Sequence, residues 1–134
     1  MIEQANKYDL TQSSLARQNI LNNKIALGAI QEEIGIHGVL FEQSYRFIKK
    51  QIADFFNVTE RTIELCLEKH EKELVKNGYE VLKGKRLIDF KLAACSSNAP
   101  EMDFGNKISQ LGVFDFRAFL NISLFSFILR IFEI

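Results

Sequence analysis

The stretch KKQIADFFNVTERTIELCLE, residues 49–68, has the residue pattern of two helices joined by a tight turn. Ile52, Ala53 and Phe56 fall at i, i+1 and i+4, which places them on one face of a first helix. The small side chain of Ala53 lets a second helix cross close by. Asn57 follows where the turn needs a positive φ, which asparagine tolerates better than most residues other than glycine. These features predict a helix-turn-helix.

The residues that follow the turn support the same interpretation. Thr59 can cap the second helix, because its hydroxyl can accept a hydrogen bond from an unpaired backbone N–H. Ile63 and Cys66 lie four and seven residues after Thr59, so both would face back onto the first helix. Val58 would fill the corner between the helices. An αα-corner buried inside some other helical domain would show the same spacing and is the structural alternative.

A β-hairpin is predicted after the second helix. The charged helical pattern stops at Asn77-Gly78, and YEVL (residues 79–82) is then followed by a Lys83-Gly84 turn and KRLIDF (residues 85–90). A hairpin directly after a helix-turn-helix is the layout of a winged helix. The tip would carry Lys83, Lys85 and Arg86, where they can contact a phosphate backbone. A solvated hairpin tip without a ligand is the alternative.

The N-terminal part is predicted to support this module. Residues 1–12 are polar and are expected to be frayed or strand-like. Ser13-Ser14 can cap one or two amphipathic helices that break at Asn22-Asn23. Residues 34–41 are apolar with two glycines, which indicates a turn and a short strand.

The C-terminal part is strongly apolar. Residues 118–129 carry no charge, but a membrane-spanning helix needs about 20 apolar residues. We therefore expect a buried helix, with a membrane role as a minor alternative. Because the apolar positions go all round that helix, we also expect residues 118–134 to leave an exposed apolar patch that causes self-association or binds a protein partner.

Together these patterns predict a mostly α fold with a small β-hairpin. The expected parts are an N-terminal support segment (1–43), a winged helix-turn-helix (44–92), a linker (93–103) and an apolar C-terminal segment (104–134).

Composition narrows the functional classes. Seventeen basic residues balance seventeen acidic ones, but residues 44–91 hold eleven of the basic residues against eight acidic ones, a local excess of three. The two cysteines form no disulfide framework or zinc pattern, and a polar start without an apolar leader favours the cytoplasm. Without a phosphate-binding glycine loop, a nucleophile elbow or a metal-ligand set, we expect no enzyme, no cofactor and no metal.

Several separate segments resemble one class of proteins. These are LNNKIAL near residue 21, the run from YRFIKK through RLIDFK, and FGNKISQLGVFDFRAFLN near residue 104. The chain is similar over about residues 17–121 to bacterial DNA-binding proteins of mobile elements, the relatives of RhuM-type virulence proteins and phage antirepressors. The resemblance implies a helix-turn-helix protein rather than an enzyme. The chain departs from it after FRAFLN, where the ending ISLFSFILRIFEI resembles a truncated or frame-altered version.

The sequence therefore predicts a protein that binds double-stranded DNA and acts as a transcriptional or mobile-element regulator. The second helix would enter the major groove, with Arg61 reading guanine and the wing residues touching phosphates. Glu60, Glu64 and Glu68 form an acidic i, i+4 stripe that would repel phosphates. The rival hypothesis is a protein-interaction module or antitoxin-like partner that no longer binds DNA. The candidate DNA-binding residues are Thr59, Glu60, Arg61, Thr62, Glu64, Lys83, Lys85 and Arg86.

Overall fold

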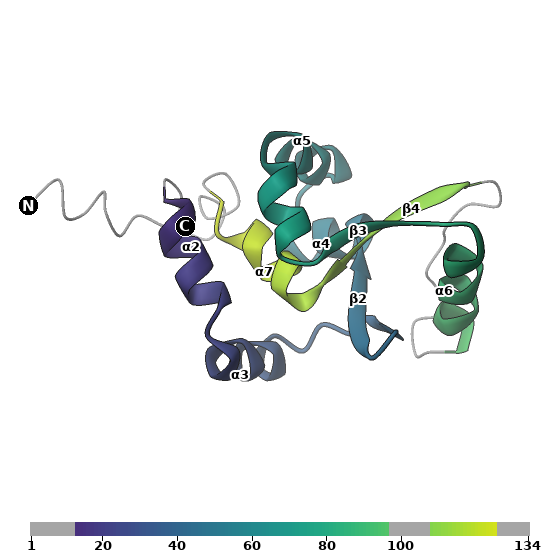
Figure 1. Ribbon diagram of the computed structural model, residues 1–134, viewed down its shortest axis with the longest axis horizontal. Coiled ribbons are helices and arrows are strands. Elements are labelled where there is room, and N and C mark those ends of the chain that lie inside the picture. The colour runs from purple at the N-terminus through teal and green to yellow at the C-terminus, as the bar shows by residue number, and fades with distance from the viewer. Residues whose placement is uncertain (1–12, 97–107, 126–134) are drawn as a thin grey trace, which may run out of the picture.

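The computed structural model describes residues 13–96 and 108–125 of the 134-residue chain. These residues form six helices and a four-stranded antiparallel sheet, so the predicted mostly helical fold is confirmed (Figure 1). The elements in chain order are α2 (Ser14–Leu21), α3 (Lys24–Ile34), β1 (Val39–Phe41), β2 (Ser44–Ile48), α4 (Lys49–Phe56), α5 (Glu60–Lys76), β3 (Tyr79–Lys83), α6 (Gly84–Ser96), β4 (Gln110–Asp115) and α7 (Phe116–Ser123).

The N-terminal helices begin and end where the sequence indicates. The Ser13 side chain caps α2 by accepting a hydrogen bond from the Ala16 N–H at 3.1 Å. Asn22 ends this helix, and the Asn23 side chain caps α3. The expectation for residues 1–12 lies outside the described residues.

The last strand in the chain lies inside the sheet. The strand order is β1-β2-β4-β3, so β4 pairs with β2 on one side and with β3 on the other. Phe114 of β4 is opposite both Phe47 and Tyr79. The C-terminal segment therefore completes the sheet that the middle of the chain begins.

The predicted hairpin over residues 79–90 is wrong. β3 forms as expected, but its partner is β4, and the chain turns at Gly84 (φ 58°) into helix α6. The helical period explains the difference, because Leu87, Phe90 and Ala94 repeat at i, i+3 and i+7 and are all buried. A short apolar run such as RLIDF suits a strand or a helix, and tertiary burial selects the helix here.

The hairpin of this fold lies earlier in the chain. β1 and β2 are joined by Glu42 and Gln43, which have positive φ values of 51° and 69°. Two-residue hairpin turns with two positive φ values usually contain Asn-Gly or Asp-Gly. Because Glu-Gln carries no such signal, the strand over Ser44–Ile48 was missed, whereas the predicted short strand before it is confirmed.

Each face of the sheet has its own hydrophobic core. One face packs against α6, and its core consists of Val39, Phe41, Ile48, Leu82, Leu87, Phe90, Ala94 and Val113. The other face presents Phe47 and Phe114 to α2, α4, α5 and α7. Neighbouring strand residues such as Phe47 and Ile48 thus serve opposite layers, as the alternation of a strand requires. Figure 1 shows α6 at one end of the molecule, away from α2 and α3.

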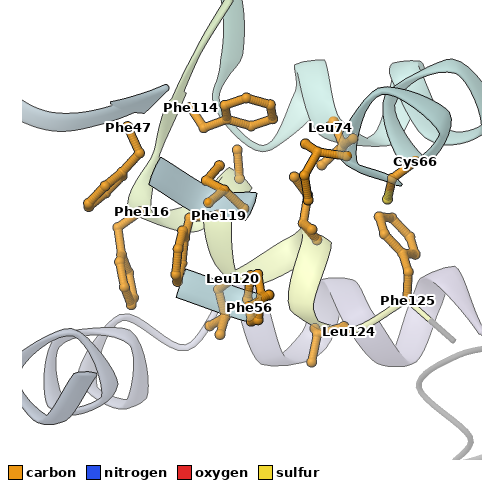
Figure 2. Packing of buried hydrophobic residues seen from close by; sticks show 14 of the residues in the cluster. Phe47, Phe56, Cys66, Leu74, Phe114, Phe116, Phe119, Leu120, Leu124 and Phe125 are labelled. Atoms are coloured by element: carbon orange, nitrogen blue, oxygen red, sulfur yellow. The ribbon is translucent and has the colours of Figure 1, made fainter. Parts of the chain in front are cut away.

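Helix α7 is the centre of the larger core. The Phe119 ring lies 5.3 Å from Phe47 and 5.4 Å from Phe56, measured between ring centroids. Figure 2 shows Phe116 and Phe119 on the side of Phe47, and Phe125 near Cys66. The expected exposed patch is therefore wrong for residues 118–125, all of which are buried except the half-buried Ser123. A helix that is apolar all round is enclosed here by its own domain, and residues 126–134 lie outside the described part.

A polar network beneath the surface ties α7 to α5 and α2. Arg17 of α2 forms two hydrogen bonds of 2.7 Å with the Glu73 carboxylate of α5. Asn121 of α7 donates to the same carboxylate at 2.7 Å and accepts from Asn77 at 2.8 Å. The Asn77 amide also exchanges hydrogen bonds with Gln18 at 3.0 and 3.2 Å. Three helices from distant parts of the sequence are thereby fixed in one arrangement.

Gly78 gives a sharp test of the junction between α5 and α7. Gly78 has a φ of 114°, and a Cβ there would lie 2.1 Å from the Asp115 carboxylate, which caps α7. Gly78→Ala is expected to lower the free energy of unfolding by about 1–3 kcal/mol, because it adds backbone strain and displaces the cap. Urea denaturation measures the effect.

Gly28→Ala is the matched control. Gly28 lies in α3, and a Cβ there would meet nothing within 4 Å. This substitution should raise the stability by roughly 0.5–1 kcal/mol, since alanine suits a helix interior better than glycine. Equal effects of the two substitutions would contradict the close approach of Gly78 to Asp115.

The network also predicts how stability depends on pH. Burial raises the pKa of Glu73, but the hydrogen bonds from Arg17 and Asn121 and the positive charges of Arg17 and His70 together outweigh burial, so the net pKa lies below the ordinary value of 4.5. The carboxylate therefore stabilises the fold above pH 4.5, and this contribution disappears as the pH falls through the depressed pKa.

Glu73→Gln should therefore cost about 3 kcal/mol at neutral pH, because it removes the carboxylate that pairs with the buried Arg17. The substitution should also flatten the stability profile below pH 4.5. Thermal unfolding between pH 3 and pH 7 measures both effects. Glu71→Gln, at an exposed position of the same helix, is the control and should leave the profile intact.

Candidate nucleic-acid interface

Two helices joined by a tight turn are present where the sequence predicts them. Asn57 ends α4 in the left-handed conformation, with φ 56° and ψ 46°. The Val58 N–H donates to the Ala53 carbonyl at 2.9 Å, which closes the turn. The Thr59 hydroxyl then caps α5 by accepting from the Thr62 N–H at 3.3 Å. The conformations predicted for Asn57 and Thr59 are therefore confirmed.

The packing of the two helices follows the predicted spacing. Ile52, Ala53 and Phe56 of α4 are buried, and Ile63 and Cys66 of α5 are fully buried. The half-buried Val58 packs against the same core. This burial fixes how α5 is rotated, and it leaves the opposite side of the helix to solvent.

The exposed side of α5 carries two kinds of charge in different places. Four carboxylates at i, i+4, i+8 and i+11, those of Glu60, Glu64, Glu68 and Glu71, line a groove between α5 and the sheet. The cations of α5 lie outside this groove and are exposed. They are Arg61, Lys69, Lys72 and Lys76. The acidic stripe noted in the sequence thus faces the sheet side of α5.

The predicted DNA-binding residues at the start of α5 differ in their exposure and in how closely their side chains are paired. Arg61 is 62% exposed and lies 3.4 Å from Glu64 and from Glu68, distances that indicate weak pairing. Glu64 is bound more closely by Lys49 at 2.8 Å, and this ammonium group lowers the pKa of Glu64. Thr59 and Thr62 share a hydrogen bond between their hydroxyls at 3.1 Å. Glu60 is exposed and lies in the first turn of the helix.

The three residues assigned to a wing tip lie elsewhere. Lys83 ends β3, while Lys85 and Arg86 belong to the first turn of α6, on the opposite face of the sheet from α5. Arg86 is paired with Glu42 and donates to Glu80 at 2.7 Å. Its charge is therefore already compensated, and no hairpin carries the three cations beside α5.

The groove beside α5 was missed by the sequence analysis. It has a volume of about 710 Å³, and its lining combines the acidic side of α5 with Lys49, Lys50, Tyr79, Phe114 and residues 110–112 of β4. The spacing of the glutamates is visible in the sequence. The other wall is not, because it is formed by a strand that follows α5 by more than thirty residues.

Cys66 and His70 are both partly or fully buried, and burial shifts the pKa of each toward its neutral form. Burial raises the pKa of the Cys66 thiol to about 12, so that the thiolate is disfavoured at neutral pH. The His70 ring stacks on Phe125 with a centroid distance of 3.9 Å, and burial lowers its pKa. In the described residues, no group of three or more His, Cys, Asp or Glu side chains could hold a metal ion.

The crossing of α4 and α5 gives a direct test of the motif. Ala53 is 1% exposed where the helices meet, so Ala53→Glu would place both a charge and extra volume in the core. Overpacking alone typically costs ~1–3 kcal/mol, and burial of the charge adds to that cost. The exposed Ala29 of α3 provides the control Ala29→Glu, which should change the urea midpoint little. Similar midpoints for the two variants would contradict the crossing.

Among the described residues, no helix is long and apolar enough to cross a membrane. Comparison with protein-family models, with curated proteins and with solved structures finds no match to this chain.

Proposed function

We propose that this protein binds double-stranded DNA by inserting α5 into the major groove, and that it acts as a transcriptional or mobile-element regulator. The observation that carries the proposal is the α4–turn–α5 geometry, with Ala53 buried at the crossing and Thr59, Glu60 and Arg61 exposed at the start of the second helix. In helix-turn-helix proteins the N-terminal residues of the second helix reach base edges.

The distribution of charge on α5 supports one orientation on DNA. Glu64 is neutralised by Lys49, and the acidic side of the helix turns toward the groove beside the sheet. Arg61, Lys69 and Lys72 are exposed outside that groove. Docking on this cationic side brings three positive charges to the duplex, and it reduces the repulsion that the acidic stripe would otherwise cause.

Each residue then has a distinct role. Arg61 reads guanine, because its weak ion pairs to Glu64 and Glu68 can be exchanged for a bidentate base contact. Lys69 and Lys72 contact phosphates. These contacts supply affinity but do not depend on the DNA sequence. Thr59 and Thr62 offer hydroxyls at the helix start. Lys83 and Lys85 make no DNA contact in this orientation, because they lie at the end of β3 and the start of α6.

Two double variants with equal loss of charge test this assignment. Lys69→Ala with Lys72→Ala should weaken binding to duplex DNA from the region flanking the gene. The slope of log Kobs against log salt should also become shallower by about 2, one unit for each phosphate contact. Lys83→Ala with Lys85→Ala should leave the affinity and the slope unchanged. Fluorescence anisotropy at several salt concentrations measures both quantities.

Arg61→Ala tests specificity separately from affinity. The loss of a bidentate base contact should cost roughly 1–3 kcal/mol of discrimination between the flanking duplex and a shuffled duplex of the same length, with little change on the shuffled DNA. If the parent protein binds neither duplex at low salt, the proposal is wrong. If the Lys83/Lys85 double variant weakens DNA binding and the Lys69/Lys72 double variant does not, then the proposed docking face is wrong.

A further inference from the structure

Strand β4 has an edge that is open over half its length. β4 pairs with β3 at all five positions from Gln110 to Phe114, but with β2 only at Val113, Phe114 and Asp115. The reason is that the chain leaves β2 at Ile48 and starts α4 at the next residue. Within the described part of the chain, residues 110–112 therefore have a strand neighbour on one side only.

This open edge lies in the groove beside α5. The groove is bounded by Ile48 and Lys49, where β2 ends, and by residues 110–112 of β4. The groove has a volume of about 710 Å³. It lies along β4 at the position that β2 would fill if that strand continued past Ile48. An unpaired strand edge is a ready template for pairing with another chain.

The floor of the groove is apolar and allows a close approach. Tyr79 and Phe114 both line the groove, with ring centroids 4.7 Å apart. Gly112 lies beside them, and a Cβ at that position would come within 2.4 Å of the Tyr79 hydroxyl oxygen. The missing side chain lets the tyrosine ring lie across β4 at this position.

The negative charge of the groove favours a positively charged ligand. Four glutamates and two lysines line it, which leaves two net negative charges (two minus four). Lys49 is paired with Glu64 at 2.8 Å and Arg61 lies 3.4 Å from Glu68, so the remaining carboxylates of Glu60 and Glu71 outnumber the single remaining ammonium group of Lys50. A positively charged occupant complements this wall.

We propose that the groove binds a short, extended, basic segment of a partner protein as an additional strand along β4. Main-chain hydrogen bonds to residues 110–112 hold the segment, and every second side chain points toward the glutamates of α5. This site uses the acidic side of α5, whereas the proposed DNA contact uses the cationic side. Lys69 and Lys72 of the proposed DNA contact lie outside the groove, so their loss should leave the peptide site intact.

The probe is a fluorescent six-residue peptide of alternating lysine and valine, and the protein is the full chain. One comparison peptide has two valines replaced by proline, which keeps the charge but removes backbone donors. The other has glutamate in place of lysine. We expect the lysine–valine peptide to bind at least ~10-fold more tightly than either comparison peptide, because strand addition needs the N–H groups and the wall needs the positive charge.

Protein variants locate the site. Glu68→Gln with Glu71→Gln should weaken the lysine–valine peptide several-fold, whereas Glu32→Gln with Glu33→Gln on α3 removes the same charge and should have no effect. In NMR spectra, the amide signals of residues 110–112 should shift on binding, and some of their hydrogens should exchange more slowly.

Three results would overturn the inference. They are the absence of binding at millimolar peptide, equal binding of the proline peptide, and binding that leaves the amides of residues 110–112 unchanged. The Lys69→Ala, Lys72→Ala variant separates the two proposals, since it should keep peptide binding whether or not the parent binds DNA.

Discussion

The carboxylate of Glu73, largely withdrawn from solvent, imposes the arrangement of the helical half of this protein. A charge that is removed from water is tolerated only when it is paired and hydrogen-bonded, and Glu73 obtains both from Arg17 and Asn121. These partners come from α2 and α7, near the two ends of the described chain. The Glu73 charge on α5 is therefore stabilised only when α2 and α7 are both packed against this helix. Asn77 extends the same constraint through Gln18 and Arg117, at distances of 2.9–3.0 Å.

The apolar packing follows from the position that this network gives to α7. β4 enters the middle of the sheet, Asp115 caps the next helix, and the aromatic side chains of α7 then fill the space between the sheet and α4. The apolar segment that forms α7 is therefore the central element of the larger core. Because α7 packs against the inner side of α4 and α5, the opposite side of α5 is exposed to solvent.

The two sides of α5 differ in charge. The burial of Ile63 and Cys66 sets the rotation of the helix, and that rotation separates the carboxylates from the exposed cations. The sheet adds an open strand edge opposite the carboxylates. In the proposed function, the cationic side of α5 contacts nucleic acid. The groove between the acidic side of α5 and β4 is the site that we propose for a basic, extended segment.

Local sequence is sufficient to specify the turn motif and the helix ends. Ser13, Asn23, Thr59 and the turn at Asn57 act through bonds to neighbours within a few residues, so their effect can be predicted without the fold. The acidic spacing along α5 is visible for the same reason. By contrast, the strand partners, the α6 helix and the fate of the C-terminal segment depend on contacts between distant parts of the chain. RLIDF suits either a strand or a helix, and its choice depends on a sheet face that β1, β3 and β4 build together. The Glu42-Gln43 turn has no local signal, because pairing of its flanking strands enforces the positive φ values. The groove likewise joins α5 to a strand distant in sequence, and no local pattern specifies which surfaces a long-range pairing will bring together.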